Sequence, residues 1–69
     1  MPEENERALA ERHVMAARQI VARQRQRVLQ LDAIGADTLS ARQTLDVFET
    51  SLQIFEGHWD QLKHERGRQ

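Results

Sequence analysis

Residues 41–62, ARQTLDVFETSLQIFEGHWDQL, carry apolar side chains at spacings that alternate between four and three. This spacing places them along one seam of an α-helix, the pattern by which a helix packs against a partner helix. The seam holds the only Trp and both Phe of the chain, and its members are Ala41, Leu45, Phe48, Leu52, Phe55, Trp59 and Leu62. The stretch therefore predicts a helix over about residues 39–65 that needs a second helix to cover it.

A weaker repeat with the same spacing runs through the first half of the chain. Its members are Ala10, Val14, Ala17, Val21, Gln24, Val28 and Leu31, with the three valines at heptad position a. Pro2, followed by the acidic residues 3–4, is typical of a helix start, because carboxylates favour the positive end of the helix dipole. We predict a first helix over about residues 3–34.

The segment between the two repeats has the residues of a turn. Gly35 suits the end of the first helix because Gly readily adopts the left-handed conformation found there. Thr38 is the predicted N-cap of the second helix, with a capping box that starts at Ser40 as the alternative. A turn over residues 35–38 is short enough to make its two helices antiparallel neighbours. Residues 1–69 are therefore predicted to form one all-α, coiled-coil-like antiparallel two-helix hairpin.

Charged residues beside the seams support this pairing. In an antiparallel pair, heptad positions e of the two helices face each other. Centring the turn near residue 37 pairs Glu11 with Lys63, Arg18 with Glu56, Arg25 with Glu49, and Asp32 with Arg42. All four pairs have opposite signs, and because exposed pairs contribute little stability we expect them mainly to specify register.

Length and composition point to an assembly. A chain of 69 residues buries a small core, and without Cys it has neither disulfides nor thiolate metal ligands, so association is the remaining means of stabilisation. The net charge of −1 argues against a general nucleic-acid or membrane-surface binder. The first residues lack the apolar core of a signal peptide, and no apolar run is long enough for a membrane span, so we expect a cytoplasmic protein.

A second apolar line lies beside each seam, at positions c and g. Its members are Leu9, His13, Ala16, Ile20, Ile34, Val47, Ser51, Ile54 and His58. A lone hairpin would leave this line in water, which predicts another helical layer. The simplest layer is a second copy of the chain, giving a homodimeric four-helix bundle. A larger helical assembly and a different protein partner are the alternatives.

The basic residues of the first half raise the question of nucleic acid. Arg12, Arg18, Arg23, Arg25 and Arg27 follow one another with no acid between them, and such a helix could follow phosphates. The second half mirrors them with Asp46, Glu49, Glu56 and Asp60. A hairpin sets the two blocks side by side, and no aromatic residues are interleaved to stack on bases. We therefore predict a protein–protein interaction or self-association module, with a nucleic-acid-associated regulator that uses the outward Arg12, Arg23 and Arg27 as the alternative.

Candidate sites for chemistry are few. His13 and His58 come near each other in the predicted hairpin and are candidate metal ligands, although neither belongs to a ligand motif; partly buried, hydrogen-bonded histidines are the alternative. No nucleophile–base arrangement or phosphate loop is present, so we predict that the protein is not an enzyme and needs no cofactor. Gln24 interrupts its seam either as a register device or inter-subunit amide pair, or as a side chain that reaches past Phe48 to water.

Several segments resemble a known family. They are Glu11-Arg12-His13-Val14, Ile20-Val21-Ala22-Arg23-Gln24, Gly35-x-Asp37-Thr38 and Leu45-x-x-Phe48-Glu49-x-Ser51-Leu52, followed by His58. Together they make nearly the whole chain similar to a family of very short uncharacterised helical-hairpin proteins common in alphaproteobacteria such as the rhizobia. The resemblance implies a bacterial, cytosolic, stand-alone hairpin, and it implies no functional residues.

Overall fold

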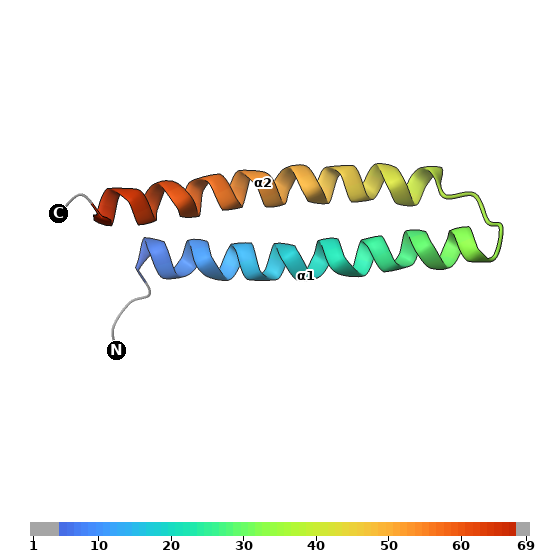
Figure 1. Ribbon diagram of the computed structural model, residues 1–69, viewed down its shortest axis with the longest axis horizontal. Coiled ribbons are helices and arrows are strands. Elements are labelled where there is room, and N and C mark those ends of the chain that lie inside the picture. The colour runs from blue at the N-terminus through green and yellow to red at the C-terminus, as the bar shows by residue number, and fades with distance from the viewer. Residues whose placement is uncertain (1–4, 68–69) are drawn as a thin grey trace.

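The structure, a computed structural model, describes the backbone of residues 5–67 and the side chains of residues 5–64. It consists of two α-helices, α1 (Glu6–Ala33) and α2 (Leu39–Gly67). They run antiparallel along their full length, with the turn at one end, and the start of α1 and the end of α2 at the other (Figure 1). The predicted all-α hairpin is confirmed.

Helix α1 begins later than the sequence suggested. Asn5 is its N-cap, and its side-chain Oδ1 accepts a hydrogen bond from the backbone N–H of Ala8 at 2.7 Å. Asn is one of the preferred N-cap residues because its side chain satisfies an amide that has no partner within the helix. The start predicted at residue 3 is therefore replaced by Glu6, and residues 3–4 lie outside the described part of the chain.

The turn contains a Schellman motif. Gly35 has φ 73°, its N–H donates to the carbonyl of Asp32 at 3.0 Å, and the N–H of Ala36 donates to the carbonyl of Leu31 at 3.0 Å. This pair of bonds satisfies carbonyls that the helix leaves open at its C-terminus. Gly35 thus ends α1 as predicted, while Ile34 is the C-cap and not a helical residue.

Two residues divide the capping of α2. Thr38 occupies the N-cap position, since its carbonyl accepts the N–H of Arg42 at 2.9 Å. Its hydroxyl, however, accepts from Nε of Arg42 at 2.9 Å, and the amide of Leu39 donates instead to Oδ1 of Asp37 at 2.9 Å. The predicted cap position is right, but Asp37 supplies the capping side chain.

The core is strongly asymmetric between the helices. Its buried side chains all belong to α1 and are Ala10, Val14, Ala17, Val21 and Val28. None of the described side chains of α2 is buried: Ala41, Leu45, Phe48, Leu52, Trp59 and Leu62 are half-buried, and Phe55 is 36% exposed. The large side chains of α2 cover the small ones of α1 and themselves stay partly exposed in the hairpin.

Within residues 5–67, neither helix combines the length and the apolarity needed to cross a membrane.

Candidate functional site

The seam divides the hairpin surface into two flanks, and charges occupy the first. Nη2 of Arg18 lies 3.0 Å from Oε2 of Glu56, and Nη2 of Arg25 lies 3.1 Å from Oε2 of Glu49. We call this side, at heptad positions e, the ion-pair flank. These are the two central pairs of the predicted register, and both are confirmed. All four side chains are more than a third exposed, so the pairs align the helices and add little stability.

The two outer pairs of the prediction are wrong. Nζ of Lys63 lies over the ring of Trp59, 4.0 Å from its centroid, and the guanidinium of Arg42 donates to the hydroxyl of Thr38. Neither base pairs with the acid that the register assigned to it among the described side chains. An aromatic face one turn away and a hydroxyl four residues back are nearer partners for flexible side chains than a carboxylate on the other helix.

Trp59 lies under the ion-pair flank. Besides Lys63, the guanidinium carbon of Arg18 lies 6.0 Å from its ring centroid, so two cations approach the indole. Its Nε1 is buried without a hydrogen-bond partner, alone in this among the side chains of residues 5–64. The indole therefore contributes through its ring rather than through its N–H.

The second flank is apolar and exposed. We call it the apolar flank, and it comprises the nine residues of the predicted second line, at positions c and g. Exposed fractions are 41% for Leu9, 40% for Ile20, 78% for Ile34, 62% for Val47 and 66% for Ile54. His13, Ala16 and His58 are exposed as well, and Ser51 is half-buried. Eight of the nine predicted interface residues are thus exposed in the hairpin, and Ser51 alone among them is half-buried.

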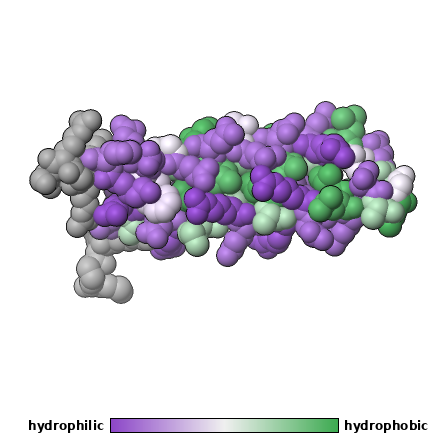
Figure 2. Space-filling view, in the orientation of Figure 1, coloured by the Kyte–Doolittle hydropathy of each residue, from purple (hydrophilic) through white to green (hydrophobic). Residues whose placement is uncertain are grey.

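Figure 2 shows one long face of the molecule. Charged and polar side chains cover most of it, while apolar side chains are visible between the helices and at the turn end. Leu29 and Leu39, exposed by 61% and 62%, join Ile34 at that end.

A shallow hollow interrupts the surface of α2 beside the apolar flank. It measures about 280 Å³ and is lined by Asp46, Val47, Thr50 and Ser51. Val47 and Ser51 belong to the apolar flank, so the hollow is a recess at the edge of that surface. It is open, and Asp46 is its single ionisable side chain.

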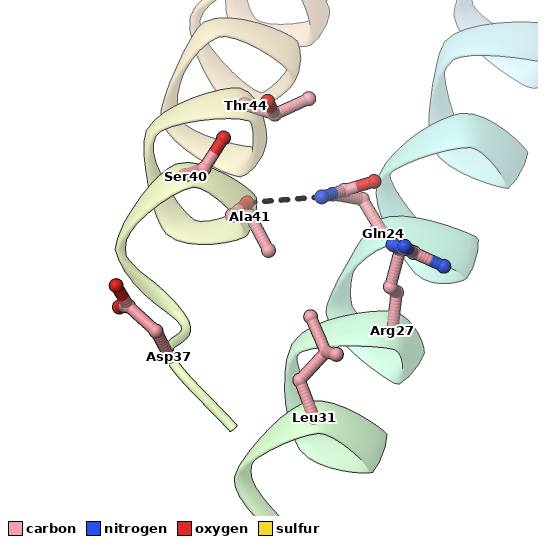
Figure 3. A pocket seen from close by; sticks show the side chains of 7 residues that line it. All are labelled: Gln24, Arg27, Leu31, Asp37, Ser40, Ala41 and Thr44. Carbon is pink, nitrogen blue, oxygen red and sulfur yellow. Dashed lines mark hydrogen bonds between the residues drawn. The ribbon is translucent and has the colours of Figure 1, made fainter.

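A second hollow lies between the helices near the turn. Figure 3 shows its lining residues, which are Gln24, Arg27, Leu31, Asp37, Ser40, Ala41 and Thr44, around about 440 Å³. Across it, Nε2 of Gln24 donates to the backbone carbonyl of Ala41 at 2.9 Å. Because Ala41 is small, the amide reaches the main chain of the facing helix. This bond favours the interpretation of Gln24 as a register device, acting within one chain.

Two of the histidines contact neighbouring residues in the hairpin. The ring of His13 lies 5.4 Å from that of Phe55 at 45°, and His64 contacts Asp60 on its own helix. Nowhere in the described part of the chain do three or more His, Cys, Asp or Glu side chains come together as ligands for an ion. His13 therefore acts as an aromatic neighbour of Phe55 at the edge of the apolar flank.

The outward arginines are spread over α1. Arg12, Arg23 and Arg27 are exposed, and Arg27 also lines the hollow at the turn. Arg18 and Arg25, which complete the basic block, are already neutralised by Glu56 and Glu49.

Comparisons with protein-family models, with curated proteins and with solved structures gave no match to this chain.

Proposed function

We propose that this protein is a non-enzymatic self-association module, and that two hairpins join through their apolar flanks into a homodimeric four-helix bundle. In this proposal it acts in the bacterial cytoplasm, like the short alphaproteobacterial hairpins that its sequence resembles. Any further protein partner would bind the assembled dimer.

The observation that carries the proposal is the incomplete burial of α2. Phe55 is 36% exposed, and Val47 and Ile54 beside it are exposed by 62% and 66%. Each fully buried side chain of this size contributes about 1.5–3 kcal/mol, so the lone hairpin leaves much of its stabilisation unused. A second helical layer on this side would cover the open edge of the aromatic seam and the apolar flank together.

The dimensions of the flank suit a second copy. Helix α1 has 28 residues, and such a helix is about 42 Å long. Two helices packed side by side are about 20 Å across, giving a footprint of about 800 Å². A standard stable interface buries about that much on each partner. One copy of the hairpin is therefore large enough to cover the flank of another.

Phosphate binding has less support. Two of the five arginines in the basic block are engaged with Glu56 and Glu49. The surface opposite those pairs exposes Ile20, Val47 and Ile54 beside Arg23 and Arg27, whereas nucleic-acid sites combine positive charge with groups that stack on bases or enter a groove. A regulator that uses Arg12, Arg23 and Arg27 remains the competing function.

Thermal unfolding at several protein concentrations tests the proposal. A dimer that unfolds to monomers has a Tm that rises with concentration, whereas the Tm of a monomeric hairpin does not change. We expect the Tm to rise across a hundredfold range of protein concentration. Circular dichroism measures it through the loss of the helical signal. A Tm that does not change with protein concentration would contradict self-association. If that Tm instead rose when duplex DNA was added in low salt, the result would favour the competing function.

A further inference from the structure

We propose that mild acid separates the dimer, because it protonates His13 and His58, two imidazoles that the interface covers. This inference rests on the proposed function, since it concerns the pH dependence of association through the apolar flank.

His13 is packed against a part of the seam that the hairpin leaves partly exposed. Its ring lies 5.4 Å from the ring of Phe55 on the other helix, at an angle of 45°. Phe55 is 36% exposed, and His13 is exposed beside it. A second copy that covers the exposed part of Phe55 therefore also covers the imidazole that contacts it.

His58 lies on the same part of the surface. It follows Ile54 by four residues and Phe55 by three, and residues at these spacings are neighbours on the surface of a helix. Ile54 is 66% exposed, and His58 is exposed as well. The proposed dimer thus covers both of these imidazoles in each protomer.

The charged neighbours of His13 on α1 give an imidazolium little support. Glu6 shares heptad position g with His13 but precedes it by seven residues, about 10 Å along the helix. Glu11 is closer in sequence, but it lies at position e, on the opposite side of the seam. The other ionisable residues of α1 at positions c and g are Arg23 and Arg27, and their charge has the same sign as that of a protonated imidazole.

The carboxylates near His58 on α2 are directed to other partners. Oδ2 of Asp60 lies 3.4 Å from Nδ1 of His64, and Glu56 pairs with Arg18 on the ion-pair flank. Among the described side chains of α2, no ionisable residue other than His58 occupies position c or g. Protonation of His58 therefore adds a positive charge to a surface without a carboxylate partner from this helix.

Proton uptake and association therefore oppose each other. An imidazole changes its charge between about pH 8 and pH 5. Water solvates the charged form in the separate hairpin, whereas in the dimer the charge lies among the apolar side chains of the flank, where burial without a partner is unfavourable. The separate hairpins bind more protons than the dimer, so by linkage the dimer loses stability as the pH falls.

Sedimentation velocity of the full-length chain measures the dissociation constant of the dimer at about pH 7.5 and about pH 5.5, at constant ionic strength. Exposed carboxylates stay mostly ionised across this range, so the pairs of the ion-pair flank are kept. We expect the dissociation constant to rise at least roughly tenfold at the lower pH.

The variant His13→Gln, His58→Gln replaces both imidazoles by neutral polar side chains. The ratio of its dissociation constants at the two pH values should stay near one. Because each ratio compares a protein with itself, a generally weaker dimer does not affect the comparison. His64→Gln is the matched control: His64 is exposed and contacts Asp60 on its own helix, so this variant should keep the pH dependence of the unmodified chain.

Four outcomes decide the matter. A rise in the unmodified chain and in His64→Gln that is absent from the double variant supports the inference. A dimer with the same dissociation constant at both pH values overturns it and leaves self-association standing. An equal rise in the double variant also overturns it, because other groups would then carry the pH dependence. A monomer at both pH values overturns the inference together with the proposed function.

Discussion

The double variant Ile20→Asp, Ile54→Asp places carboxylates in the middle of the apolar flank. In the lone hairpin these side chains are 40% and 66% exposed. Their combined exposed surface equals about that of one isoleucine side chain per protomer, and the dimer would bury it. Burying that much contributes about 1.5–3 kcal/mol, or about 3–6 kcal/mol for the two protomers of a dimer. Losing it weakens the dimer by a factor of roughly 10²–10⁴, because about 1.4 kcal/mol corresponds to a tenfold change.

The carboxylates add a further cost, since charges in an apolar interface lose hydration without gaining partners. We therefore expect the double variant to be monomeric, with a lower Tm than the unmodified chain. The assay is sedimentation velocity at matched concentrations, together with circular dichroism to follow the helical content.

The variant Gln19→Asp, Gln53→Asp is the control. Each Gln immediately precedes one of the isoleucines, is exposed, and points away from the apolar flank. This control adds the same charges to the same helices and should keep the mass of the unmodified protein. If the isoleucine variant also kept its mass and its Tm, the apolar flank would not be an interface and the reasoning would be refuted.

Three further predictions concern the hairpin itself. In a double-mutant cycle measured by urea unfolding, Arg25→Glu and Glu49→Arg should each cost about 0.2–1 kcal/mol, and the doubly reversed variant should recover part of that loss; strict additivity would contradict the pairing. Gln24→Glu removes the donor to the α2 carbonyl and should destabilise the hairpin by about 1–3 kcal/mol, whereas Gln24→Leu should be nearly neutral; equal effects of both on the urea midpoint would argue against the bond. Gly57→Ala should raise the Tm, because α2 gains a better helix former that stabilises it by up to about 1 kcal/mol. Gly35→Ala should lower the Tm, because φ is positive at that position. A change of the same sign in both variants would contradict these backbone assignments.

Much of the fold could be predicted because hydrophobic spacing and turn chemistry agree. The seam from Ala41 to Leu62 requires a helix with a partner, and Gly35 ends α1 in the structure as expected from its conformational freedom. The two central ion pairs follow from the same register. These features depend on positions along the chain, and positions can be read directly from a sequence.

The departures come from competition between local partners. Lys63 has both a carboxylate across the seam and the ring of Trp59 within reach, and spacing does not rank them. Asn5 is the N-cap of α1, and its residue type is the signal for that role, but the acidic residues before it suit a helix start equally well. The partial exposure of α2 follows from the difference in side-chain size between the seams, which is small on α1 and large on α2. The residue types show this difference, but the spacing of apolar residues alone does not. The hollow at the turn could not be foreseen, because it depends on how closely Ala41 lets Gln24 approach the main chain.

Sedimentation equilibrium of the unmodified full-length chain tests the central claim most directly. The chain has a mass of 8.1 kDa, and sedimentation equilibrium measures the mass in solution without an assumption about shape. At micromolar concentration self-association predicts a folded, helical species of twice that mass, which dissociates on dilution. A folded, helical species of 8.1 kDa across the whole concentration range would contradict it.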